Sequence, residues 1–198
     1  MAFDPQDYYF KRAKTEDYAA RSVYKLQEIH NRFRIFEIGD TVLDLGASPG
    51  SWSQYAAQLV GKNGRIVGVD LTPITLKIPN AHFIVADIRE ETTAQKILDT
   101  GLKIPVDVVI SDMAPKTTGV KITDQSRSFE LCTLALSCAQ KWLKPGGNFV
   151  AKLFDGPDFN LFREELRQSF RQVEILRPKS TRKESKELFF IGLHKLSQ

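Results

Sequence analysis

Short apolar runs alternate with stretches of helical periodicity along most of the chain. Runs of strand length are expected at residues 41–45, 65–69, 81–85, 106–110, 148–153, 173–176 and 187–193. Helical spacing of apolar residues predicts helices at 17–33, 51–60, 92–99, 124–142 and 159–170. This alternation predicts an α/β protein with a mostly parallel, seven-stranded sheet and helices on both faces. The last strand follows its predecessor without an intervening helix, so we expect it to be antiparallel.

Length and composition favour one domain spanning residues 1–198. The chain is 42% hydrophobic and 26% charged, as is typical of a globular protein large enough to bury a core. No apolar run approaches the roughly 20 residues that cross a bilayer. Asp4 and Asp7 stand where a secretory signal would be apolar. Residues 4–10 show no clear periodicity, so we expect an extended or mobile start within a flexible N-terminal segment at residues 1–16.

Cysteine and histidine usage indicates neither disulfides nor a metal site. Cys132 and Cys138 fall on one predicted helix at a spacing that cannot form a bridge, which is typical of core residues in a reducing compartment. His30, His82 and His194 lack the spacing of metal ligands. We therefore expect a cytoplasmic protein without metal or membrane association.

Positive charge is concentrated towards the two ends of the chain. The whole sequence has a net charge of +4, and residues 11–34 and 177–186 each carry a net charge of +4. The remainder is therefore acidic, a distribution that favours a polyanionic partner, although two solvated surface segments would give the same pattern. Aromatic and basic residues at 8–12 would either stack on RNA or pack against the fold.

The stretch at residues 41–52, TVLDLGASPGSW, predicts a strand, a glycine turn and a helix start, the order in which α/β proteins form ligand sites. A dinucleotide fingerprint would need glycine where Ser48 and Ser51 stand. A hydrolase elbow with Ser48 as nucleophile would need a main-chain N–H at the next position, and Pro49 has none. Both of these interpretations are rejected.

Acidic residues follow several predicted strands, where ligands bind in such sheets. The residues expected at or near these carboxyl ends are Asp44, Gly46, Asp70, Asp87, Asp112 and Lys152. Asp70 follows Gly46 at about the interval of an acid that binds a nucleoside ribose. Four acids without a phosphate-binding loop favour a cationic nucleoside such as S-adenosyl-L-methionine, although a single acid at a strand end is more often a cap or turn residue.

The chain resembles the FtsJ-like (RrmJ/RlmE) RNA ribose 2′-O-methyltransferases from about residue 17 to residue 193. The resemblance is carried by SVYKL (22–26), DLGASPGSWSQ (44–54), SDMAP (111–115), LKPGGNFVAKLF (143–154) and SKELFFIG (185–192). The five segments in this order are specific, whereas each alone is weak to moderate. The resemblance implies a Rossmann-like methyltransferase fold.

The family's Lys-Asp-Lys-Glu tetrad maps onto Lys25, Asp112, Lys152 and Glu187, which the resemblance makes catalytic. It also implies that S-adenosyl-L-methionine is bound by Gly50, Trp52, Asp70, Asp87 and Asp112. We expect Lys152 to be central, either as an amine that accepts the proton of the ribose 2′-hydroxyl or as an ammonium that stabilises the developing alkoxide. A surface ion pair would explain Lys25 and Glu187 equally well, but not a lysine inside an apolar strand.

The resemblance implies methylation of a uridine ribose in large-subunit (23S-type) ribosomal RNA, and hence a role in ribosomal RNA processing and ribosome biogenesis. We expect a monomer that binds ribosomal RNA or the large ribosomal subunit. One alternative is a 2′-O-methyltransferase acting on transfer RNA or on a messenger RNA cap. A second is a non-catalytic RNA-binding or ribosome-assembly factor that keeps the cofactor fold.

Overall fold

The computed structural model describes residues 5–182 and 185–197, so Lys183 and Glu184 of the basic segment 177–186 lie outside the described residues. The strands are β1 (Thr41–Leu45), β2 (Arg65–Asp70), β3 (Ala81–Val85), β4 (Val106–Ser111), β5 (Leu143–Phe154), β6 (Phe170–Leu176) and β7 (Glu187–Lys195). The helices are α1 (Pro5–Thr15), α2 (Val23–Phe33), α3 (Ser51–Val60), α4 (Glu91–Asp99), α5 (Lys121–Trp142) and α6 (Phe159–Ser169).

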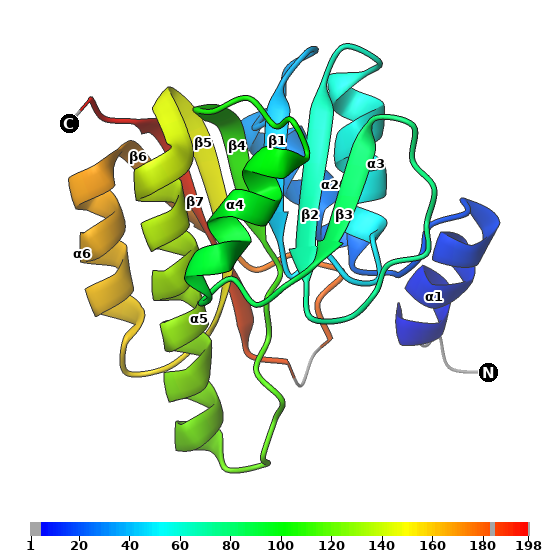
Figure 1. Ribbon diagram of the computed structural model, residues 1–198. Helices are drawn as coiled ribbons and strands as arrows, with labels where there is room; N and C mark the ends of the chain where they lie inside the picture. The colour runs from blue at the N-terminus through cyan, green and yellow to red at the C-terminus, as the bar shows by residue number, and fades with distance from the viewer. Residues whose placement is uncertain (1–4, 183–184, 198) are drawn as a thin grey trace.

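The strands form one sheet in the order β3-β2-β1-β4-β5-β7-β6 (Figure 1). β1 pairs in parallel with β2 and β4, and the parallel pairs β2–β3 and β4–β5 extend the sheet on either side. β7 is antiparallel to both β5 and β6. The predicted mostly parallel, seven-stranded sheet with an antiparallel last strand is therefore confirmed.

Helices cover both faces of the sheet, as predicted. α4, α5 and α6 lie on the near face in Figure 1, while α2 and α3 lie on the far face. Each face has its own apolar cluster, one containing Leu136 of α5 and Phe162 of α6, the other Leu26 of α2 and Ala56 of α3. Strands β1 and β4 supply side chains to both clusters, which is why most of their residues are apolar.

The expectation of an extended start is wrong for the described part of the N-terminal segment, because Pro5–Thr15 forms the helix α1. Tertiary packing stabilises this helix where sequence periodicity is weak. Ala13 is buried with Tyr24 of α2, and the Tyr9 ring packs on the Tyr24 ring at a centroid distance of 5.3 Å. The Arg12 guanidinium also lies over the Tyr24 ring, 4.6 Å from its centroid.

Four predicted boundaries move by three residues or more, and one of them is the start of β6, at Phe170 rather than residue 173. Asp17 has a positive φ of 58°, so the helix expected from residue 17 is interrupted and α2 begins at Val23. α5 begins three residues before Asp124, whose carboxylate accepts main-chain N–H bonds from Thr118 and Gly119 and so fixes the turn that precedes the helix. β5 begins at Leu143 rather than residue 148, since Leu143 pairs with Val106 before a shift in register.

Within residues 5–182 and 185–197, no helix has the length and apolar character needed to span a membrane. Cys132 is buried and Cys138 half-buried, and both are free thiols.

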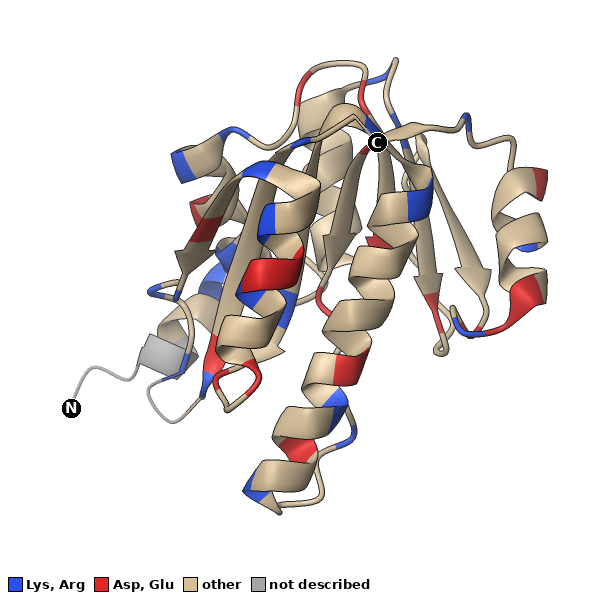
Figure 2. Cartoon of the chain, turned by 90° about the vertical axis from the view of Figure 1, so that its left-hand side faces the viewer, with Lys and Arg blue, Asp and Glu red and all other residues tan. Residues whose placement is uncertain are grey.

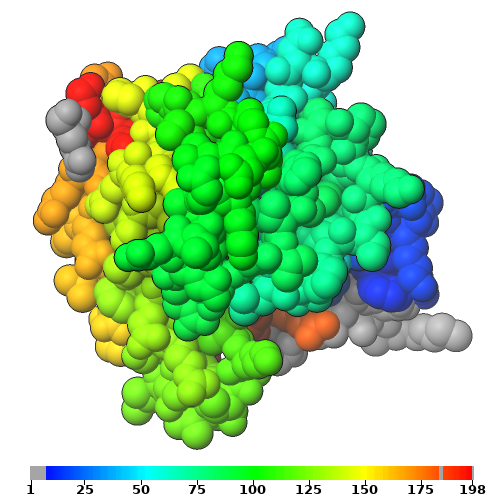
Figure 3. All heavy atoms as spheres, viewed as in Figure 1, coloured from blue at the N-terminus to red at the C-terminus, as the bar shows by residue number. Residues whose placement is uncertain are grey.

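The first turns of α5 project beyond the body of the molecule at the end where the parallel strands finish (Figures 1 and 3).

We predict that Phe190→Ala lowers the free energy of unfolding by about 3–5 kcal/mol, because a fully buried aromatic side chain is lost from a packed core. The Phe190 ring contacts the rings of Phe159 and Phe162, each at a centroid distance of 5.1 Å. Urea unfolding followed by circular dichroism measures the change. Phe10→Ala is the matched control, since Phe10 is 52% exposed, and should cost less than about 1 kcal/mol. Equal losses in the two variants would contradict the described core.

Candidate active site

The carboxyl ends of β4 and β5 bring Lys152 and Asp112 together. Ser111 pairs with Ala151, so the residue that follows each of them lies at the same level of the sheet. Lys152 Nζ lies 2.9 Å from Asp112 Oδ1 and donates a hydrogen bond to the Asp112 main-chain oxygen at 2.7 Å. Lys152 is only 5% exposed, so this is a buried ion pair rather than a solvated one.

A second buried pair joins α2 to the start of β7. Lys25 Nζ donates to Glu187 Oε2 at 2.6 Å and lies 5.6 Å from the centroid of the Phe189 ring. Burial raises the pKa of the Glu187 carboxyl, but the charge and hydrogen bond of Lys25, aided by the charge of Lys152, outweigh it and leave that pKa below its ordinary value. Glu187 is therefore an ionised acceptor near neutral pH.

The two pairs form one cluster. In the sheet, Phe154 of β5 lies opposite Glu187 of β7, and Lys152 lies opposite Phe189. Lys152 and Glu187, one from each ion pair, therefore occupy the same short section of two adjoining strands. The effect of Lys152 on the pKa of Glu187 shows that their charges act on each other. The structure thus brings together the four residues that the sequence motifs single out as a tetrad.

Asp44 at the end of β1 adds a buried acid to this region. It is fully buried and accepts a hydrogen bond from Ser53 Oγ at 2.6 Å. Burial raises the pKa of Asp44 to about 7; the Ser53 hydroxyl opposes this rise, whereas the charges of Asp112 and Asp70 add to it. The Asp44 carboxyl group therefore lies close enough to Asp112 and Asp70 to be repelled by their charges.

Asp70 and two glycines shape the turn beside Asp44. Asp70 accepts hydrogen bonds from the Ser48 N–H at 3.0 Å and the Thr72 N–H at 2.7 Å, and so ties the turn to the end of β2. Gly46 has a φ of +77°, and a Cβ there would lie 2.6 Å from the Met113 side chain. Gly50 has a φ of +109° just before α3. Only glycine fits both positions without strain.

Trp52 and Asp87 are held by protein partners. The Trp52 side chain is buried, donates its indole N–H to the Ser22 main-chain oxygen at 3.0 Å and packs on Phe189 at a centroid distance of 5.7 Å. The Asp87 carboxylate follows β3 and binds the Arg89 guanidinium at 2.6 Å. Their assignment to cofactor binding stays a prediction.

Several supporting residues were missed by the sequence patterns. Ser53 holds Asp44, Phe189 packs against both Lys25 and Trp52, and Cys132 donates its thiol hydrogen to the Lys152 main-chain oxygen at 2.7 Å. A serine within an apolar helix face is a weak signal for Ser53. The contacts of Phe189 and Cys132 join different elements of the fold and leave no local signal in the sequence.

The donor set at the strand ends fits a cationic cofactor such as S-adenosyl-L-methionine. Asp44 Oδ1 and Asp112 Oδ1 are buried without a hydrogen bond, the latter because the nearby Lys152 ammonium is not aligned with it. A positive ligand would relieve the repulsion that the charges of Asp112 and Asp70 exert on Asp44. Within residues 5–182 and 185–197, no group of three or more His, Cys, Asp or Glu residues is placed to hold a metal ion.

The family model of the FtsJ-like methyltransferases matches residues 18–195. The chain is 53% identical over 195 residues to a ribosomal RNA large subunit methyltransferase E from Bdellovibrio bacteriovorus, with 98% of this chain and 100% of the relative covered. It is 50% identical over 191 residues to the protein of that name from Lawsonia intracellularis, with 95% and 94% covered. The chain belongs to the FtsJ-like methyltransferase family.

Solved structures agree with this placement. A ribosomal RNA methyltransferase from Plasmodium falciparum is similar with a TM-score of 0.80 and 28% identity, covering 91% of this chain and 100% of that one. An Aeropyrum pernix fibrillarin, solved with S-adenosyl-L-methionine, is similar in fold with a TM-score of 0.58 and 17% identity, covering 79% of this chain and 67% of that one. The fold is therefore the Rossmann-like methyltransferase fold.

The raised pKa of Asp44 predicts that the protein loses stability as pH rises from about 4 to 7. Over this range Asp44 is ionised in the unfolded chain but still protonated in the folded one, so raising the pH favours unfolding. Asp44→Asn should remove this part of the slope, measured by urea unfolding between pH 4.5 and 7.5.

Asp87→Asn is the control for that experiment. The hydrogen bonds and charge of Arg89 lower the pKa of Asp87, so its contribution is present above pH 4 and is lost only at more acidic pH. The slope between pH 4.5 and 7.5 should stay as in the unmodified protein. An unchanged slope in Asp44→Asn would mean that Asp44 is ionised throughout this range.

Proposed function

We propose that this protein transfers a methyl group from S-adenosyl-L-methionine to the 2′-hydroxyl of a ribose in large-subunit ribosomal RNA, at a uridine. The observation that carries the proposal is the buried Lys25–Glu187 and Lys152–Asp112 cluster beside the acidic turn of β1. Relatives about half identical to this chain are named ribosomal RNA large subunit methyltransferase E, which supports ribosomal RNA as the substrate.

The proposed cofactor site is formed by Asp44, Gly46, Gly50, Asp70 and Asp112. When bound, S-adenosyl-L-methionine supplies a methyl group attached to a positively charged sulfur. The glycines let the main chain approach a ligand closely, and the carboxylates complement its positive charge. Trp52 would support this site indirectly, because its hydrogen bond to the Ser22 main-chain oxygen fixes the start of α3.

Lys152 is the proposed catalytic residue. A ribose hydroxyl is a weak nucleophile and loses its proton as it attacks. An ammonium group has three hydrogens to donate. Lys152 donates one to the Asp112 main-chain oxygen, while the Asp112 carboxylate lies 2.9 Å away as a counter-charge without an aligned hydrogen bond. A further hydrogen is available to the 2′-oxygen, where a positive group stabilises the negative charge that develops. Asp112 thereby holds the Lys152 ammonium in a fixed place.

Lys25 and Glu187 are proposed to position the ribose. Glu187 is kept ionised by Lys25, so it can accept a hydrogen bond from a sugar hydroxyl. The Phe189 ring, which packs on Trp52, forms an apolar surface against the Lys25 ammonium. An enzyme acting on ribosomal RNA in this way would work in the cytoplasm, and nothing in the chemistry requires more than one copy of the chain.

Mapping ribose methylation in cells with and without this protein tests the proposal. A methylated 2′-hydroxyl cannot take part in alkaline cleavage, so the target nucleotide should resist alkali only when the protein is present. We expect one such position in large-subunit RNA. Resistance at a transfer RNA or at a messenger RNA cap would instead support the alternative substrates. A methylated base with normal alkaline cleavage would contradict ribose chemistry altogether.

Lys152→Met should lower the rate of methyl transfer by at least about 10³-fold, because the group facing the 2′-oxygen is lost while its apolar stem is kept. Binding of S-adenosyl-L-methionine, measured by calorimetry, should change little. The assay is transfer of radiolabelled methyl groups to ribosomal RNA from cells lacking the protein.

Lys144→Met is a matched control, since Lys144 also extends from β5 and pairs with an aspartate of β4, Asp107, at the opposite end of the strands. It should retain activity close to that of the unmodified protein. If Lys152→Met remained active, Lys152 would not be the catalytic residue. If ribosome assembly were restored equally by an inactive Lys152→Met, the non-catalytic RNA-binding role would be favoured.

A further inference from the structure

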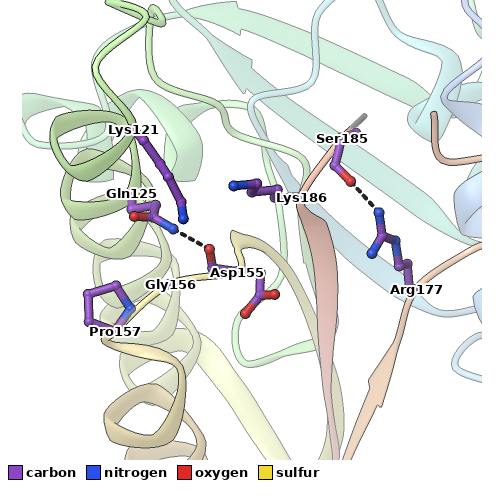
Figure 4. Close-up of a pocket in the computed structure, with 8 residues that line it drawn as sticks. All are labelled: Lys121, Gln125, Asp155, Gly156, Pro157, Arg177, Ser185 and Lys186. Carbon is purple, nitrogen blue, oxygen red and sulfur yellow. Dashed lines mark hydrogen bonds between the residues drawn. The ribbon is translucent and has the colours of Figure 1, made fainter. Parts of the chain in front are cut away.

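A basic hollow lies next to the tetrad, between the start of α5 and the start of β7. It has a volume of about 460 Å³ and is lined by Lys121, Gln125, Asp155, Gly156, Pro157, Arg177, Ser185 and Lys186 (Figure 4). Three of these side chains are basic and one is acidic. This volume is within the range of sites that hold small molecules or parts of larger ligands.

Two lysines face each other across the hollow. Lys121 is the first residue of α5 and Lys186 immediately precedes β7, and their side chains extend towards one another (Figure 4). The contact with Lys121 lowers the pKa of the Lys186 ammonium below its ordinary value, and exposure to the charge of Asp155 only partly opposes this. Two ammonium groups held this close repel each other, so an anion between them would be stabilised.

The walls of the hollow are well fixed. Gln125 donates a side-chain hydrogen bond to the main-chain oxygen of Asp155, and the Asp155 N–H binds the Lys186 main-chain oxygen at 2.8 Å. Arg177 donates to the Ser185 main-chain oxygen at 2.5 Å. α5, the end of β5 and the start of β7 are thereby linked. The lysines project from this frame, with basic and acidic positions alternating along the rest of α5 (Figure 2).

Two residues that line the hollow lie close to tetrad residues in the sequence. Lys186 is the neighbour of Glu187, and Asp155 comes three residues after Lys152, which corresponds to about 10 Å along a strand. A strand of RNA with its target ribose at Lys152 would bring a nearby backbone phosphate to this distance. A phosphodiester carries the single negative charge that two facing ammonium groups complement.

We propose that Lys121 and Lys186 form a binding site for a backbone phosphate of the substrate RNA close to the methylated nucleotide. This rests on the proposed function and extends it, because it gives the direction in which the RNA leaves the tetrad. Arg177 borders the site and adds positive charge. Single phosphates that are contacted in this way position the RNA and carry no sequence information.

The test is the double variant Lys121→Gln/Lys186→Gln, compared with Lys62→Gln/Lys103→Gln. The control removes two exposed lysines before β2 and β4, at the opposite edge of the sheet, and so changes the net charge equally. We expect the KM for large-subunit RNA to rise about tenfold in the double variant, well beyond any change in kcat. The slope of log affinity against log salt should become shallower by about 1.

Equal KM values and salt slopes in the double variant and the control would overturn the proposal. A normal KM for RNA, combined with loss of a response to added inorganic phosphate, would assign the hollow to a free anion instead. A normal KM for naked RNA but a raised KM for ribosomal particles would assign it to a ribosomal protein.

Binding measured by gel shift without a methyl donor separates this proposal from the proposed function. If the unmodified protein methylates no RNA but binds it, and the double variant binds about tenfold less tightly than the control, the phosphate site stands and the proposed reaction fails. If methylation occurs and the affinities of the double variant and the control are equal, the phosphate site fails and the proposed reaction stands.

Discussion

The candidate active site depends on the burial of two lysine–carboxylate pairs in one small volume. Removing these charges from water is costly, and the attraction within each pair compensates for the cost only when the geometry is held closely. Lys25–Glu187 joins α2 to β7, and Lys152–Asp112 joins β5 to the end of β4. The site therefore requires four elements to keep their relative positions, which a helix pair or a hairpin alone could not ensure.

The antiparallel strand explains how this geometry is reached. Parallel strands present their last residues at one edge of the sheet, where Asp44, Asp70 and Lys152 lie. An antiparallel strand begins at that same edge, so Glu187 at the start of β7 comes next to the end of β5. Insertion of β7 between β5 and β6 thus adds a carboxylate to a row of strand ends.

Periodicity in the sequence predicted the sheet and the residues at its carboxyl edge, because both follow from local alternation and strand order. It did not predict α1, whose packing on Tyr24 is a tertiary contact. The partnership of Lys25 and Glu187 came from family resemblance alone, since 162 positions separate them. Lys186 belongs to the basic segment 177–186, from which the sequence predicted a polyanionic partner, but its contact with Lys121 was not predicted, because 65 positions separate the two lysines.

Charge is arranged on two sides of the tetrad. On one side, the charges of Asp70 and of Asp112, itself a tetrad residue, repel that of Asp44, and a positive ligand would relieve this repulsion. On the other, Lys121 and Lys186 repel one another and would be stabilised by a negative one. A methyl donor with a positive sulfur and an RNA backbone have these opposite charges. Under the proposed function each ligand relieves the repulsion on its own side. Lys25 and Lys152, each paired with a carboxylate, would then lie between the two ligands.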